Sequence, residues 1–352
     1  MLRSAPIEKT KIKQILIRGT NWVGDAVITL PALESVRQTF PDSNLTVLAR
    51  PWVQAVYENH PAVDRVIPYP KGRNLGERLL LFHKTIKEIR SHSYDLAVLF
   101  QNAFEAGLLA YLAGIKYRVG FNTDGRGFLL THAVRRNAEL LKQHQVEYYL
   151  YILRSLGWEA HSRDPALFIA ASDMEFVREL LASRNIHPHD FILGLSPGAM
   201  YGPAKRWPPE RFAAIGDRAA AAWNAKVVII GSSGEKRICE TVRQNMRHPS
   251  LNLAGQTSLG QVMALIALCR FFVTNDSGLM HVAAALNRPM VAVFGSTDPG
   301  ATGPRSSKAR WVQHPLDCSP CFKPQCKRGF ACMLGIEPDE VWEAMEKGRE
   351  YS

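Results

Sequence analysis

The sequence contains 352 residues, which is long for one hydrophobic core and fits two domains of ordinary size. Hydrophobic residues make up 46% of it and charged residues 21%, which excludes an intrinsically disordered chain. Lys and Arg number 43 against 32 Asp and Glu. The net charge of +11 favours anionic partners, namely nucleotides, phosphorylated lipids, membrane surfaces or nucleic acid, without choosing among them.

Membrane-spanning and secretory segments are not predicted. No run of about 18 apolar residues occurs, and Met1–Lys13 carries charges without the apolar centre of a signal peptide. We therefore expect a cytoplasmic protein that is at most peripheral to a membrane. Six cysteines in a chain of this length do not predict a disulfide scaffold.

The first half of the chain predicts alternating strands and helices, beginning with a glycine loop. Gln14–Arg18 is a β-branched strand, and the loop Gly19–Asp25 leads into a helical pattern. Because Gly19 and Gly24 lie five residues apart, the loop is not the GxGxxG dinucleotide fingerprint, and no nicotinamide cofactor is expected. Further strands are expected at Asn44–Ala49, Arg65–Pro68, Leu96–Phe100 and Tyr117–Gly120, and helices at Leu75–His92 and His144–Leu156. This alternation predicts a parallel sheet covered on both faces.

A basic, glycine-rich stretch, Arg118–Arg136, follows the last of these strands. Two interpretations stay open for it. Its arginines either hold an anionic acceptor or form a solvated charged surface.

The strand and helix pattern restarts in the second half, so a domain boundary is expected near Pro165–Ser172. The predicted elements are strands at Phe191–Ser196, Lys226–Gly231 and Leu251–Ala254, and helices at Glu210–Trp223, Glu235–Met246 and Leu259–Leu268. We expect an N-terminal domain of residues 1–165, a C-terminal domain of residues 166–335, and a helix within residues 336–352 that packs across the domain junction. Open α/β sheets bind ligands at the carboxyl ends of their strands, so both glycine loops are expected to face a cleft between the domains.

The stretch Phe271–Phe294 predicts a buried strand, a tight turn, a buried helix and another strand. Asp276 in the turn is a plausible N-cap, while Ser277 and Gly278 open the helix with free N–H groups, as at an anion site. His281 lies one turn further along. The alternative is that Asp276 only caps the helix and His281 is an ordinary core histidine.

Two other loops of the second half carry candidate binding residues. Ser196 ends a strand, and the small-residue loop after it leads to Lys205 and Arg206, two cations suited to a diphosphate leaving group. Ordinary solvated cations are the alternative. Glu235 follows the strand at Lys226–Gly231 and either binds ribose hydroxyls or favours a helix N-terminus.

Four segments in order resemble glycosyltransferase family 9, the heptosyltransferases: RGTNWVGDAVITLPAL, SPGAMYGPAKRWPPERFA, LAGQTSLGQVMALIALC and NDSGLMHVAAALNRPMVAVFGSTDP. Within that family the GPAKRWP form and the cysteine-rich tail are most similar to type II members. The resemblance implies a GT-B fold of two Rossmann-like domains facing across a cleft, with the acceptor on the first domain and the nucleotide sugar on the second. It also implies inverting transfer of L-glycero-D-manno-heptose from ADP-heptose to the first heptose of the Kdo2–lipid A inner core of lipopolysaccharide.

The resemblance implies roles for individual residues. Asp25, preceded by Gly24, matches the family's proposed catalytic base, and Lys205 matches its phosphate-binding lysine. Glu235 matches the acid near the adenosine ribose, and Asp276 with Gly278 matches the turn that holds the donor sugar and diphosphate. Since Asp25 begins a helix, the alternative is that it only stabilises the helix start.

The tail contains a C-x2-C-x4-C-x5-C array formed by Cys318, Cys321, Cys326 and Cys332. The first pair has metal-ligand spacing, so the array is either a structural zinc site or a set of reduced thiols in a packed loop. No cofactor is expected to be required for catalysis, because no DxD-type acidic pair flanks the diphosphate turn.

The expected partners are ADP-heptose, a lipid A-linked acceptor and, through that lipid and the positive charge, the cytoplasmic face of the inner membrane. The alternatives are heptosyltransferase I or another family 9 enzyme with a different donor or acceptor, and a nucleotide-sugar epimerase of the same architecture. Nucleic-acid binding is not expected, because the basic residues are dispersed and no known nucleic-acid motif occurs.

Overall fold

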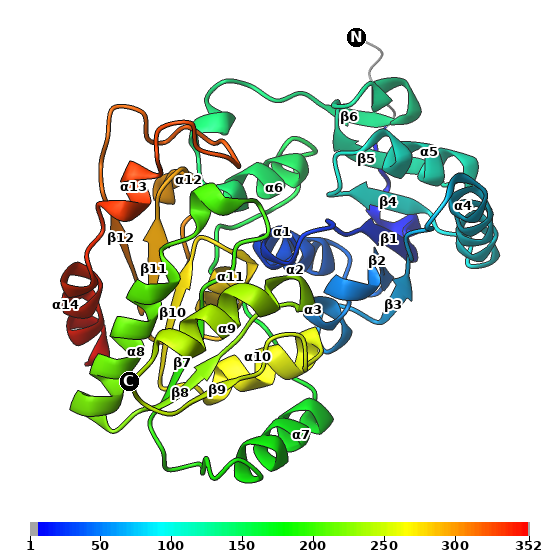
Figure 1. Cartoon of the computed structure of the whole chain (residues 1–352). Helices are drawn as coiled ribbons and strands as arrows, with labels where there is room; N and C mark the ends of the chain where they lie inside the picture. Colours follow the sequence, from blue (N-terminus) through cyan, green and yellow to red (C-terminus); the bar gives the residue numbers. More distant parts are fainter. Residues whose placement is uncertain (1–5, 351–352) are drawn as a thin grey trace. The chain divides into compact units, whose positions relative to one another are not determined.

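The computed structural model describes residues 6–350 and divides the chain into two compact units, Met1–Pro165 and Ala166–Ser352. Each unit contains a parallel sheet with helices on both faces, so each is a Rossmann-like domain (Figure 1). None of the helices within residues 6–350 has the length and apolar character needed to cross a membrane.

The N-terminal domain has the strand order β3-β2-β1-β4-β5-β6. Its strands are β1 (Gln14–Arg18), β2 (Asn44–Ala49), β3 (Arg65–Pro68), β4 (Leu96–Leu99), β5 (Tyr117–Phe121) and β6 (His132–Val134). Its helices are α1 (Val23–Ile28), α2 (Leu30–Thr39), α3 (Ala55–Glu58), α4 (Leu75–Ser91), α5 (Phe104–Leu112) and α6 (Gln145–Arg154). The central strand β1 is buried from Ile15 to Arg18, as expected for a strand whose two faces are covered by helices.

The C-terminal domain has the strand order β12-β11-β10-β7-β8-β9. Its strands are β7 (Ile192–Ser196), β8 (Lys226–Ile229), β9 (Ser250–Asn252), β10 (Phe271–Asn275), β11 (Met290–Phe294) and β12 (Ala309–Gln313). Its helices are α7 (Ala171–Ala182), α8 (Pro209–Trp223), α9 (Lys236–Asn245), α10 (Leu259–Leu268), α11 (Gly278–Ala285), α12 (Pro299–Thr302), α13 (Ala331–Leu334) and α14 (Pro338–Arg349), with 3₁₀ turns at η5 (Pro203–Lys205) and η6 (Ser233–Glu235).

In both sheets the chain order reverses beside the first strand. In the first sheet β1 lies between β2 and β4, and in the second sheet β7 lies between β8 and β10. At such a point the loops after two neighbouring strands lead to opposite faces of the sheet and leave room for a ligand at the carboxyl edge. The candidate site residues follow these strands.

The last helix packs on the C-terminal domain. Its buried residues Val341, Trp342 and Met345 belong to the core of that domain, while its packing across the domain junction stays a prediction. The packing on the C-terminal domain arises because the apolar face of α14 covers β11 and β12 beside α8, where Trp342 lies 4.6 Å from Trp223 between ring centroids.

Candidate functional site

The carboxyl edge of the C-terminal sheet is held together by Asn275, the last residue of β10, which is fully buried. Its amide nitrogen donates to the carbonyl oxygen of Pro197 at 2.8 Å, and its amide oxygen accepts from the backbone N–H of Trp207 at 3.0 Å. Both partners lie in segments that follow β7. Asn275 therefore fixes the loop after β7 against the turn after β10, a role that the sequence analysis did not assign to it.

Lys205 and Asp276 form a buried ion pair at this edge. The ammonium nitrogen of Lys205 lies 2.5 Å from Asp276 Oδ2, and the side chains are 13% and 4% exposed. The hydroxyl of Thr297 donates to the same carboxylate oxygen at 2.5 Å. Lys205 also lies 4.9 Å from the ring centroid of Tyr201. The predicted phosphate-binding lysine and the predicted donor-sugar aspartate thus occupy one site.

Arg206, the second predicted cation, supports the backbone. Its Nε and Nη2 atoms donate to the carbonyl oxygen of Ala199 at 3.3 and 3.2 Å. Ala199 lies in the loop that follows Ser196, and Ser196 itself is buried at the end of β7. Arg206 therefore braces this loop.

The turn before α11 differs in detail from the expectation. The N-cap residue is Ser277, without a side-chain capping bond, and Gly278 is the first helical residue. Asp276 is not the cap, because its carboxylate is turned toward Lys205 and Thr297. His281 is buried in the same helix. The helix start therefore keeps backbone N–H groups that no capping side chain occupies.

Glu235 is connected to both neighbouring loops. Its Oε2 atom accepts from the backbone N–H and hydroxyl of Ser232 at 2.8 and 2.7 Å, completing a capping box. Its Oε1 atom lies against Gly198, where an added Cβ would come within 2.0 Å of it. Glu235 thus stabilises the helix start, which is one of its two predicted roles, and only Gly at position 198 leaves its carboxylate this room.

In the N-terminal domain, Gly24 and Asp25 lie in the first turn of α1, whose N-cap is Trp22. Asp25 is the third helical residue, so it is not the capping residue. Burial raises the pKa of Tyr57 and of Tyr149, and the negative charge of Asp25 adds to both shifts. The Asp25 carboxylate therefore lies near two buried phenols, and Asp25 itself is half-buried.

A cluster around Tyr69 was not predicted from the sequence. The guanidinium carbons of Arg18 and Arg50 lie 5.2 and 4.2 Å from its ring centroid, and its hydroxyl donates to Glu105. Arg18 is 3% exposed, and burial, followed by the charge of Arg50, lowers its pKa to about 10. The cluster stands at the carboxyl ends of β1 and β2. Its only sequence signal was an arginine that ends an apolar strand.

The arginines of the basic stretch Arg118–Arg136 do not all behave alike. Neither predicted interpretation, an anionic acceptor site or a solvated charged surface, describes all of them. Arg126 is fully buried and donates to the carbonyl oxygens of Phe121 and Ala103 at 3.0 and 3.3 Å, while Arg118 donates to that of Leu129 at 2.6 Å. These two side chains bind the backbone of their own domain. The structure leaves Arg135 and Arg136 exposed.

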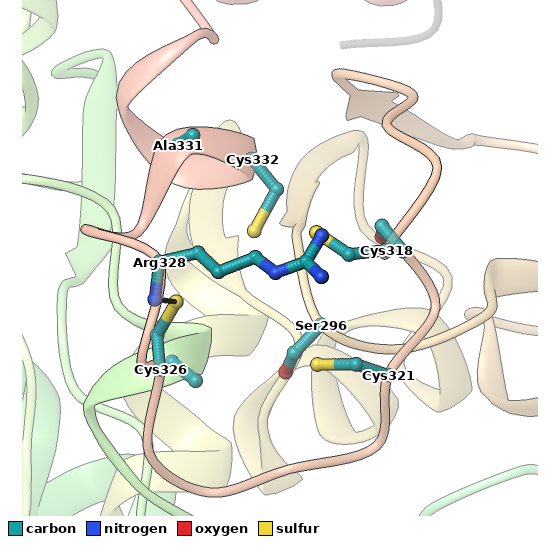
Figure 2. Close-up of a pocket in the computed structure, with 9 residues that line it drawn as sticks. Ser296, Cys318, Cys321, Cys326, Arg328, Ala331 and Cys332 are labelled. Carbon is teal, nitrogen blue, oxygen red and sulfur yellow. Dashed lines mark hydrogen bonds between the residues drawn. The ribbon is translucent and has the colours of Figure 1, made fainter.

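The four tail cysteines line one cavity of about 30 Å³, which Arg328 also borders (Figure 2). They are free thiols. Burial raises the pKa of Cys332, and the other three cysteines contribute to the shift. The sequence array is therefore one cluster in space.

These features agree with comparisons to known proteins. The model of glycosyltransferase family 9 (heptosyltransferase) matches residues 82–331. The chain belongs to glycosyltransferase family 9. It is 31% identical to lipopolysaccharide heptosyltransferase 2 of Escherichia coli K12 over 94% of this chain and 97% of that protein. It is 32% identical to lipooligosaccharide heptosyltransferase 2 of Haemophilus ducreyi over 95% of this chain and 99% of that protein.

Among solved structures, the E. coli ADP-heptose LPS heptosyltransferase II is similar to this family 9 chain with a TM-score of 0.81 and 28% identity, covering 96% of this chain and 99% of that one. The predicted fold class is confirmed: the two parallel α/β sheets are those of the GT-B heptosyltransferases. The predicted family and the predicted enzyme class are confirmed as well.

Proposed function

We propose that this family 9 heptosyltransferase transfers L-glycero-D-manno-heptose from ADP-heptose to the first heptose of the Kdo2–lipid A inner core, with inversion at the anomeric carbon. The observation that carries the proposal is similarity over nearly the whole chain to enzymes named heptosyltransferase 2. The arrangement around Lys205 and Asp276 supports it, because it provides groups for both parts of a sugar diphosphate.

The C-terminal domain binds ADP-heptose in this proposal. The ammonium group of Lys205 has three donors and uses one for Asp276, so it can donate to the diphosphate without leaving its partner. The backbone N–H groups of Ser277 and Gly278 at the start of α11 add donors for the phosphates. Asp276 and His281 face the heptose hydroxyls, and Glu235 accepts from the adenosine ribose. Arg206 and Ser196 hold the loop that lies beneath the phosphates.

Asp25 in the N-terminal domain is the proposed base. It accepts the proton of the acceptor hydroxyl while that oxygen bonds to the anomeric carbon, the bond from this carbon to the diphosphate oxygen breaks, and ADP leaves with the electron pair. The start of α1 favours the ionised carboxylate, which is the form that accepts a proton.

Catalysis in this proposal requires no metal ion, because Lys205 and the N-terminus of α11 supply the positive potential for the departing diphosphate. Turnover is expected to stay unchanged when Mg²⁺ is left out of the assay, with no chelator present that could remove a structural zinc ion. A loss that Mg²⁺ restores would contradict this part of the proposal.

Peripheral contact with the cytoplasmic face of the inner membrane is assigned to the N-terminal half of α4. Apolar residues follow one stripe along this helix, but only its C-terminal part, Ile86 and Ile89, enters the domain core. Leu75, Leu79 and Leu80 are 70%, 60% and 53% exposed. The helix also carries exposed basic side chains: Arg78, Lys84 and Lys87. Exposed leucines beside cations match a surface of anionic lipid.

Sedimentation with vesicles tests this surface. The triple variant Leu75→Ser, Leu79→Ser, Leu80→Ser is expected to lose most binding to phosphatidylglycerol-containing vesicles, whereas wild type binds them better than neutral phosphatidylcholine. Leu141→Ser is the matched control, since Leu141 is 59% exposed on the same domain. Equal binding by the triple variant would show that α4 is not the contact.

Acceptor mass tests the reaction itself. Purified protein is incubated with ADP-heptose and monoheptosyl Kdo2–lipid A, with heptose-free Kdo2–lipid A as the parallel acceptor. Gain of one heptose only on the first acceptor supports the proposal, and gain only on the heptose-free acceptor indicates heptosyltransferase I. Conversion of the donor without either acceptor would indicate an epimerase.

A further inference from the structure

The four tail cysteines belong to a long segment without regular structure. The chain runs from the end of β12 at Gln313 to the start of α13 at Ala331 without a helix or strand. Segments of this length are uncommon inside a compact domain unless something fixes them or gives them a function. A bound metal ion is one of the means by which small irregular segments are fixed.

The four thiols border one small cavity. Cys318, Cys321, Cys326 and Cys332 line the same cavity of about 30 Å³ (Figure 2). A water-sized guest needs about 10–15 Å³, so the cavity has room for a metal ion. The hydroxyl of Ser296 also lines this cavity, and it is buried without a hydrogen-bond partner.

Backbone N–H groups already bind one of the four sulfur atoms. The Sγ atom of Cys326 accepts from the backbone N–H groups of Arg328 and Phe330 at 3.2 and 3.3 Å. Such bonds to a ligand sulfur are part of the outer shell of metal sites. Lys323, Lys327 and Arg328 in the same segment provide the positive charge that complements a divalent ion bound by four thiolates.

We propose that these four cysteines bind one tetrahedral metal ion, Zn²⁺. Four sulfur ligands select a thiophilic metal, and four-cysteine zinc sites are closed structural sites. Within residues 6–350, no group of three or more His, Cys, Asp or Glu side chains is arranged around a common metal position as these side chains stand. Binding therefore requires the thiols to rotate about χ1 and the exposed Arg328 side chain, which extends among them in Figure 2, to turn toward solvent.

The consequence of this site, which rests on the proposed donor site, is the positioning of Lys205. Ala204 and Ser296 border the cavity, and their sequence neighbours Lys205 and Thr297 both donate to Asp276. The tail segment is also bonded to this wall, from Ala204 N–H to the Pro324 carbonyl at 3.1 Å and from Phe322 N–H to the Ser296 carbonyl at 2.7 Å. The ion thus fixes the backbone segments that position Lys205 and its partner Thr297.

Metal analysis of the full-length chain tests the proposal. Protein purified without added metal or chelator is expected to contain about one zinc ion per chain. When a mercurial reagent is titrated in, the zinc should be released as the four thiols react. Reconstitution with Co²⁺ is expected to give the visible absorption bands of a tetrahedral thiolate site. The variant Cys318→Ser, Cys321→Ser should lose at least 90% of the metal, while Cys269→Ser, which removes a thiol outside the cluster, keeps it.

The same variant separates this site from the proposed reaction. Its Kd for ADP is expected to rise about tenfold, and its melting temperature to fall, whatever acceptor the enzyme uses. Wild-type protein that folds, lacks zinc even after anaerobic incubation with ZnCl₂ and shows four freely reacting tail thiols would overturn the proposal. So would zinc that persists in the double variant. Iron in place of zinc would keep the site and overturn the assignment of the ion.

Discussion

The ammonium group of Lys205 lies 2.5 Å from the carboxylate of Asp276, although the two residues are separated by 71 positions and belong to different loops. A buried ion pair of this kind contributes little net stability, because desolvation of both charges opposes their attraction. It does fix two functional groups in a defined position, and Thr297 fixes the carboxylate from the other side. Its presence at the switch point of the C-terminal sheet indicates a preorganised binding site.

Replacing Lys205 by Met is expected to weaken ADP binding at least tenfold and to lower the free energy of unfolding by about 3 kcal/mol, since a buried carboxylate loses its partner. Adding Asp276→Asn removes that carboxylate charge, so stability should recover while ADP affinity does not. Lys205→Arg keeps the charge and serves as the control. Calorimetric titration with ADP and urea unfolding measure the two effects, and unchanged ADP affinity in Lys205→Met would remove Lys205 from the phosphate site.

Replacing Asp25 by Asn is expected to lower turnover by about 10²–10⁴-fold, the contribution of a general base. The Kd for ADP should stay within twofold, because Asp25 lies in the N-terminal domain and the proposed nucleotide site in the C-terminal one. Asn keeps a polar side chain in the first turn of α1, so the melting temperature should change little. Single-turnover kinetics at saturating donor give the rate. A variant with near-normal turnover would restrict Asp25 to stabilising the helix start.

Substitutions can separate the observed role of Glu235 in the capping box from its proposed role in ribose binding. Glu235→Gln is expected to raise the Kd for ADP several-fold, whereas Ser232→Ala breaks the capping box and costs about 1 kcal/mol of stability with ADP affinity kept. Gly198→Ala is a third probe, because its methyl group would displace the Glu235 carboxylate without changing its charge. If Ser232→Ala weakens ADP binding as much as Glu235→Gln does, Glu235 acts only through the helix start.

The sequence predicted the sheets well because parallel strands that are covered on both faces are continuous apolar runs. Asn44–Ala49 and Leu259–Leu268 begin and end where we expected them. The elements that it missed include α5, α7, β6 and β12. For α7 and β6 there is a physical reason. Helix α7 buries only Val177 and Leu181, and β6 is a three-residue strand at the sheet edge, so neither leaves a strong apolar pattern.

Candidate site residues were predictable where they share a short segment, and less so where their partners are distant. The turn Asn275–Gly278 could be recognised, but the pairing of Lys205 with Asp276 depends on which strands become neighbours. Arg18 and Arg126 show the same limit. A single sequence does not distinguish a buried arginine that binds backbone carbonyls from a solvated one.

The buried thiols of Cys239 and Cys269 predict a pH dependence of stability. Burial raises the pKa of both from 9.0 to about 12. Above pH 9 the unfolded chain loses these protons while the folded chain keeps them, so the unfolded state binds fewer protons and the free energy of unfolding falls as the pH rises. The slope approaches about 1.4 kcal/mol per pH unit for each thiol.

Urea unfolding in reducing buffer between about pH 8 and pH 10 measures this pH dependence, below the range where tyrosines ionise strongly. Cys239→Ala and Cys269→Ala should each make the free energy of unfolding fall less steeply with pH. The two effects should add, because Cys239 contacts Ile230 and Cys269 contacts Leu265. A fall of the same steepness in the double variant would assign the alkaline loss of stability to other groups.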